Sequence, residues 1–135
     1  MTKKASAVIY VIILLLPIMT FLLKIIDLTI INYKINSNII FKQQSLYNAE
    51  AGIEFGIKKV KEFNPANPVN VTYYMIVKDN NVEFTDKKQD CECTCIIKIT
   101  STIKGNYVEY IIDSLGRHKS TEYEIKKVIT EPVTK

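Results

Sequence analysis

Three cysteines are the residues of this chain whose type and spacing best suit chemistry. Cys91, Cys93 and Cys95 occur two residues apart. A structural zinc site usually pairs two Cys-x-x-Cys motifs, or cysteines with histidines, and this sequence has one distant histidine, His118. Cysteines two apart on a strand face the same way, which places them poorly for a disulfide with one another. We expect buried apolar thiols, with a disulfide within or between chains and a metal site as the alternatives.

The other polar residues form no catalytic pattern. The sequence contains no nucleophile elbow, phosphate loop, metalloprotease helix or dinucleotide-binding fingerprint. His118 lies two residues after Gly116, between Arg117 and Lys119, and we expect it to be a solvated loop residue. We therefore expect no enzyme activity and no cofactor. The net charge of +4 is spread over many lysines, so direct nucleic-acid binding is not expected either.

An apolar segment near the N-terminus determines the expected compartment. Residues Ala7–Leu23 carry no charge, and about 20 apolar residues are enough for a helix to span a bilayer. The apolar pattern then continues to Ile31 with three interruptions, at Lys24, Asp27 and Thr29. Lys3 and Lys4 precede the segment, so the positive-inside rule places the N-terminus in the cytoplasm and the C-terminus outside.

A cleaved secretory signal is the competing interpretation of this segment. The cleavage site of such a signal would follow the apolar residues, whereas the small residues Ala5, Ser6 and Ala7 precede them, and no small-x-small site follows Leu23. We therefore expect a short basic leader over residues 1–5 and an uncleaved single-pass anchor over residues 6–31. The cell membrane is then the expected location, and the lipid bilayer the first expected partner.

Two features modify the expected membrane helix. Pro17 removes one backbone hydrogen bond and should bend or loosen the helix. Lys24 and Asp27 are three residues apart and share one helix face. They either reach towards the membrane surface as a helical ion pair or contact the helix of a neighbouring subunit.

An amphipathic segment over residues 32–63 is expected to continue the helix. Its apolar residues recur every three or four positions, which marks one stripe of a helix. They are Ile35, Ile39, Leu46, Ala49, Ile53, Ile57 and Val60. Pro65 should end the helix, since proline cannot continue it. Gly52 and Gly56 share one face and either reflect neutral drift or allow close packing against a sheet or another helix.

Residues 64–135 change to the two-residue period of β-strands. Strands are expected over residues 71–77, 82–84, 91–103, 108–112 and 121–130, with a hairpin at Gly105-Asn106, a loop over Asp113–Ser120 and a bulge near Val128. The expected fold class is α+β. A long N-terminal helix, first transmembrane and then amphipathic, should pack on a small extracytoplasmic antiparallel sheet.

This pilin-like architecture resembles that of type IV pilins and pseudopilins, and short sequence segments strengthen the resemblance. Ser45–Glu54, with the sequence SLYNAEAGIE, resembles the A-x-x-A-E-A-G-I-E segment of minor pilins of the PilX type. Lys3–Ile12, with the sequence KKASAVIYVI, resembles their K-K-G-S-A-L-I-x-V-L start. Ile111–Ile129 more loosely resembles a pattern that closes many such subunits. The similarity extends over about residues 3–60, under half of the chain.

The resemblance implies that a prepilin peptidase cuts between Ala5 and Ser6, and that Ser6 then becomes a candidate for N-methylation. Family leaders usually end in glycine, whereas this one ends in Ala5. The fifth mature position, a glutamate in major pilins, is Tyr10 here. Because that glutamate is thought to pair with a neighbour's terminal amine, its absence favours a minor pilin or a tip-located pseudopilin.

The function implied by the resemblance is that of a structural minor subunit of a type IV pilus, or of a pseudopilus for secretion or competence. Its implied partners are other pilin or pseudopilin subunits, the prepilin peptidase and the inner-membrane assembly platform. The expected assembly and packing residues are Tyr10, Pro17, Gly52, Ile53, Gly56 and Ile57. The alternative is a signal-anchored extracellular surface protein whose β domain acts as an adhesin or sensor.

Overall fold

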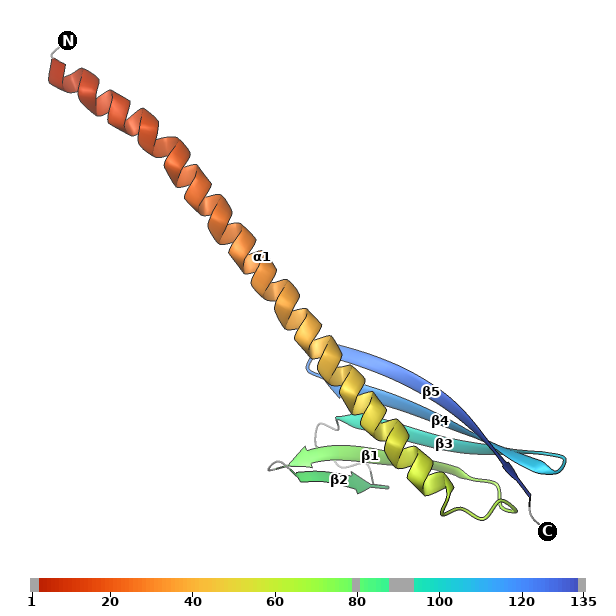
Figure 1. Ribbon diagram of the computed structural model, residues 1–135. Coiled ribbons are helices and arrows are strands. Elements are labelled where there is room, and N and C mark those ends of the chain that lie inside the picture. Colours follow the sequence, from red (N-terminus) through yellow and green to blue (C-terminus); the bar gives the residue numbers. More distant parts are fainter. Residues whose placement is uncertain (1–2, 79–80, 88–93, 134–135) are drawn as a thin grey trace. The chain divides into compact units, whose positions relative to one another are not determined.

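The computed structural model describes residues 3–78, 81–87 and 94–133, which form one long helix and five strands (Figure 1). The elements are α1 (Lys3–Val60), β1 (Asn70–Lys78), β2 (Asn81–Thr85), β3 (Cys95–Lys104), β4 (Tyr107–His118) and β5 (Thr121–Pro132). All strand pairs are antiparallel, in the order β2-β1-β3-β4-β5. The expected α+β class is confirmed. The chain divides into two units, Met1–Asn38 and Ile39–Lys135.

The first unit consists of the N-terminal part of α1. The helix continues without interruption through Pro17, whose carbonyl accepts a hydrogen bond from the Thr20 hydroxyl at 2.9 Å. The Thr29 hydroxyl likewise donates to the carbonyl of Ile25 at 2.8 Å. Both hydroxyls are therefore satisfied by the helix's own backbone, as an apolar surrounding requires.

The second unit begins with the remainder of α1, which ends at Val60 and not at Phe63 as the sequence suggested. The amides of Glu62 and Phe63 donate to carbonyls only three residues back, at 3.0 and 3.1 Å. The last turn thus tightens before Pro65, because a residue preceding proline is biased away from the helical conformation.

The core of the second unit lies between α1 and one face of the sheet. In Figure 1, the yellow and green part of α1 crosses this face over the middle strands. The helix contributes Ile53 and Val60 to the buried cluster. The sheet contributes Met75 from β1, Cys95, Ile97 and Ile99 from β3, and Val108, Tyr110 and Ile112 from β4. The amphipathic stripe therefore covers the strand face that the alternating pattern had indicated.

The expected loop over Asp113–Ser120 is wrong, because β4 continues through most of it. Its pairing with β5 extends to His118 opposite Thr121, and the chain then reverses at Lys119, which has a φ of 51°. The polar residues of this segment obscured the alternation of buried and exposed residues that is typical of a strand. Asp113 in fact faces Lys126 of β5 at 3.7 Å, as part of the regular ladder.

Two further details of the sheet differ from the sequence-based expectation. The β4–β5 register is unbroken at Val128, which lies opposite Ile111, so no bulge occurs there. Val128 is half exposed on the side of the sheet away from α1, which explains why it is out of step with the buried residues. β3 begins at Cys95, whereas Cys91 and Cys93 lie outside the described residues.

Candidate functional site

Three glycines bring α1 unusually close to the sheet. A Cβ atom added at Gly52 would overlap the Ser114 hydroxyl and lie 2.6 Å from the Cys95 sulfur. One added at Gly56 would lie 2.6 Å from the side chain of Ile112. Gly116 on β4 faces the opposite way, directly under the helix backbone at Ser45 and Ala49. The absence of side chains at these positions allows the helix to rest on the strands.

Polar groups of this close contact satisfy one another. The Ser114 hydroxyl donates a hydrogen bond to the carbonyl oxygen of Ala49 at 2.8 Å and lies 3.2 Å from the sulfur of Cys95. Both Ser114 and Cys95 are fully buried. Cys95, the first residue of β3, therefore lies in the packed interface between α1 and the sheet. Among the described residues, no group of three His, Cys, Asp or Glu side chains is placed to hold a metal ion.

Residues on either side of the turn between β4 and β5 form a second set of contacts with the helix. The Asn48 side-chain amide donates to the carbonyl of Arg117 at 2.8 Å, and the Thr121 hydroxyl donates to that of Phe41 at 3.0 Å. The ring of His118 packs 5.5 Å from the ring of Phe41. The expectation that His118 is a solvated loop residue is therefore wrong, since it ends β4 and is half-buried against the helix.

A buried tyrosine lies in the core near the beginning of β4. Tyr110 is fully buried, and its hydroxyl has no hydrogen-bond partner among the described residues. Burial raises the pKa of Tyr110, and the nearby Glu131 raises it further. The phenol therefore stays protonated at neutral pH, and its bulk serves core packing.

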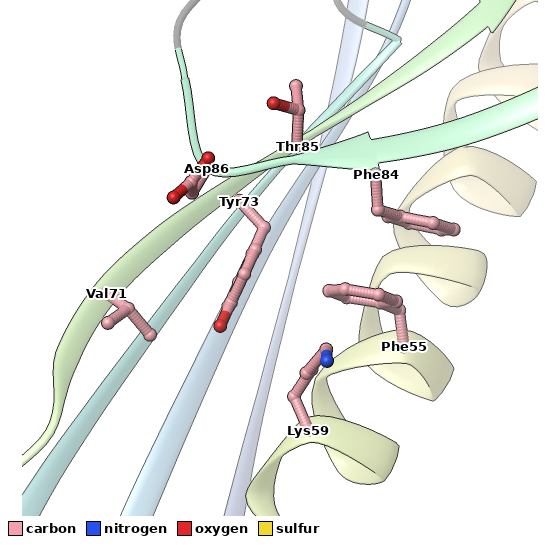
Figure 2. Close-up of a pocket in the computed structure, with 7 residues that line it drawn as sticks. All are labelled: Phe55, Lys59, Val71, Tyr73, Phe84, Thr85 and Asp86. Atoms are coloured by element: carbon pink, nitrogen blue, oxygen red, sulfur yellow. The ribbon is translucent and has the colours of Figure 1, made fainter.

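An aromatic pocket of about 440 Å³ opens between the end of α1 and strands β1 and β2 (Figure 2). The rings of Phe55 and Phe84 stack with centroids 3.9 Å apart, and Tyr73 meets Phe55 edge-on at 5.2 Å. Lys59 at its rim donates to Glu62 at 2.7 Å, and this hydrogen bond raises the pKa of Lys59. The lining residues are Phe55, Lys59, Val71, Tyr73, Phe84, Thr85 and Asp86.

The first unit presents a different kind of surface. From Ile9 to Ile31 its large apolar side chains are exposed all around the helix, from 44% at Ile25 to 71% at Tyr10. Among the described residues, one helix is long and apolar enough to cross a membrane, with a mean hydropathy of 2.6 over its most apolar window. Exposed apolar surfaces as extensive as this mark contacts with lipid or with other proteins.

The residues singled out from the sequence fall into two groups. Gly52, Ile53, Gly56 and Ile57 all belong to the second unit, where they pack against the sheet within the same chain. Tyr10 and Pro17 belong to the exposed first unit, and Ala5 and Ser6 lie within the helical backbone near its start. The sequence did not single out Gly116 and Ser114. The signal that could have identified them is the alternation of small residues after Ile112 on β4.

Comparisons of the chain with models of protein families, with curated proteins and with solved structures give no match. The fold and its surfaces define a class of protein. It is an α+β chain that combines one exposed apolar helix, long enough to cross a membrane, with a small helix-covered antiparallel sheet.

Proposed function

We propose that this chain is a membrane-anchored structural subunit of a bacterial type IV pilus or related pseudopilus, incorporated as a minor component. The observation that carries the proposal is the apolar helix of the first unit, whose large side chains are exposed on every side. Each Å² of apolar surface left in water costs roughly 25 cal/mol. The helix therefore requires lipid or other helices around it. A pilin-like subunit is surrounded by lipid before assembly and by other helices afterwards.

The second unit supports the proposal through the residues that α1 buries. In the pilin-like segment Ser45–Glu54, the buried residues are the small or sheet-facing ones, Ser45, Ala49, Gly52 and Ile53. Tyr47 and Glu50 of the same segment are exposed. The part of the chain that most resembles minor pilins thus has a physical role, which is to let a helix lie close against a sheet.

The proposal includes an orientation and a set of partners. Lys3 and Lys4 stay in the cytoplasm, and the sheet lies outside. The prepilin peptidase acts between Ala5 and Ser6, and the assembly platform then passes the subunit to other pilins or pseudopilins. Tyr10 replaces the glutamate of bulk subunits, which is why we assign a minor or tip position.

A signal-anchored surface protein is the second candidate, and the aromatic pocket favours it. The pocket presents an aromatic surface, formed by Phe55, Tyr73 and Phe84, beside the charges of Lys59 and Asp86. This combination suits binding of a small ligand. In that case the helix would serve only as an anchor. The two candidates differ in whether the N-terminus is processed.

Processing of the N-terminus distinguishes the candidates. For protein isolated from its own host, mass spectrometry of the N-terminal peptide should show a chain that begins at Ser6, with an added methyl group. Ala5→Gly should be processed at least as completely, because glycine is the usual last residue of the leader, whereas Ala5→Leu should block cleavage. A Met1 or Thr2 terminus on the native protein would contradict the pilin proposal and favour the anchored surface protein.

A further inference from the structure

In the aromatic pocket, the ring of Phe55 is occupied on both of its faces. Phe84 stacks on one face, with the two ring centroids 3.9 Å apart and an interplanar angle of 4°. The Nζ atom of Lys59 lies 5.9 Å from the centroid of the same ring, and Figure 2 shows it on the side opposite Phe84. A cation above an aromatic ring is attracted by the negative charge of the ring face. The aromatic cluster thus already holds one cationic group of its own chain.

Tyr73 leaves one ring face open to the pocket. The ring of Phe55 meets it nearly at right angles, at 75° and with the centroids 5.2 Å apart, and no other ring of the described residues packs on it. In Figure 2, Phe55 and Lys59 lie to one side of the Tyr73 ring. Val71 and Asp86, which also line the pocket, lie to the other side. The second face of Tyr73 is therefore the part of the aromatic surface that a ligand can reach.

Asp86 brings an unpaired negative charge to this side of the pocket. Its carboxylate is exposed and makes no hydrogen bond or ion pair with another described residue. The positive charge of Lys59, by contrast, is offset by Glu62, whose carboxylate lies 2.7 Å from the ammonium group. Lys87 follows Asp86 in the sequence but does not line the pocket. Because opposite charges attract, the unpaired carboxylate favours a ligand that is a cation.

We propose that the pocket binds a small organic cation that carries a guanidinium group. A guanidinium is planar, so it stacks on the open face of Tyr73 while its N–H groups donate hydrogen bonds to the carboxylate of Asp86. It is also more weakly hydrated than an ammonium group, so it loses less hydration against an aromatic surface. The cavity of about 440 Å³ lies within the range of small-molecule sites and leaves room for the organic body of the ligand.

The guanidinium group has to come from outside the chain. The single arginine of the sequence, Arg117, is bonded to Glu122 at 2.8 Å, so a second copy does not supply the ligand. The inference names the ligand of the pocket that favours the anchored surface protein, and it rests on that candidate function only for its biological use. The pocket itself lies wholly within the second unit, so a minor pilin with this fold would bind the same cation.

The test is a titration of the isotope-labelled full-length chain in detergent micelles, followed by the amide chemical shifts. The probe is N-acetylargininamide, and its matched control is N-acetylcitrullinamide, in which a neutral urea group replaces the guanidinium. The arginine probe should bind saturably and shift the amides around Tyr73 and Asp86, whereas the citrulline probe should bind about fivefold more weakly. N-acetyllysinamide should also bind more weakly than the arginine probe, because its ammonium group is compact and strongly hydrated.

Two carboxylate variants locate the site. Asp86→Asn keeps the shape of the side chain but removes its charge, so it should weaken binding of the arginine probe about fivefold. Glu83→Gln removes a carboxylate from an exposed residue of β2 that does not line the pocket, and it should leave the dissociation constant unchanged. Both side chains are exposed, so both variants should fold, and unchanged amide shifts in β3 and β4 verify this.

Each of the following results would overturn the proposal. Equal binding of the arginine and citrulline probes would mean that charge plays no part, and equal binding of the arginine and lysine probes would remove the guanidinium assignment. Equal weakening by Asp86→Asn and Glu83→Gln would show a general attraction to the surface in place of a site. Binding of arginine only within a longer peptide would make the partner a protein. Absence of binding would refute the ligand alone, whereas an unprocessed N-terminus would refute only the pilin assignment.

Discussion

Replacing Gly116 by alanine should destabilise the second unit by about 3 kcal/mol or more, since overpacking against rigid neighbours is costly. The added Cβ would overlap the carbonyl oxygen of Ser45 and the amide nitrogen of Ala49, and would lie 3.0 Å from the Ala49 Cα. These are backbone atoms of α1, which cannot rotate away as a side chain can. The helix would have to lift from the sheet, and its buried contacts would be lost.

The measurement is urea denaturation of a fragment that begins at Tyr33, followed by circular dichroism. The control is Thr102→Ala, which changes an exposed residue of β3 and should alter the unfolding free energy by less than about 0.5 kcal/mol. If Gly116→Ala and Thr102→Ala unfold at the same urea concentration, the close contact between helix and sheet does not exist as described.

Ile53→Asp should prevent the same fragment from folding. Ile53 is 6% exposed and packs in the core with Ile97 and Ile99. Removing such a side chain costs about 2–5 kcal/mol, and burying an unpaired carboxylate adds several more. The total is comparable to the whole stability of a small domain, about 5–15 kcal/mol.

Glu54→Ala is the matched control for this change. Glu54 is adjacent in sequence but exposed on the other side of α1, so its removal should have little effect on the unfolding free energy. Soluble, cooperatively unfolding protein from both variants would show that α1 does not use the Ile53 face to cover the sheet.

Local sequence patterns were sufficient to predict the main elements of this fold. Uninterrupted apolar residues followed by a three-to-four spacing predicted α1, and the alternation of Cys95, Ile97 and Ile99 predicted the buried face of β3. The Gly105-Asn106 dipeptide marked the β3–β4 hairpin, where Gly105 adopts a φ of 64°. In each case the residues concerned are neighbours on one element, so periodicity alone carries the information.

The features that the sequence did not predict depend on contacts between elements. Gly116 seemed to mark a loop, because its role appears only when Ser45 and Ala49 of α1 lie over it. His118 likewise seemed solvated, because its contact with Phe41 of the helix is evident only in the folded structure. The register between a helix and a sheet is set by side chains distant in sequence, and a pattern along one strand does not contain it.

The structure also separates the residues that hold the fold together from those available to partners. Gly52, Ile53 and Gly56 are covered by the sheet of their own chain, so they are not an open surface for assembly. On α1, the exposed surfaces are the apolar first unit and the side of the later helix at Tyr47 and Glu50. In the proposed function, assembly by helix packing would therefore use these surfaces.

Membrane insertion with the sheet outside is the central claim, and protease treatment of intact protoplasts tests it most directly. The full chain should stay in the membrane pellet after carbonate washing, because its helix from Ile9 to Ile31 is long and apolar enough to cross the lipid bilayer. Added protease should digest the region after Thr29 and leave the preceding residues protected. Recovery of the chain in the soluble fraction, or protection of the region after Thr29, would contradict the account.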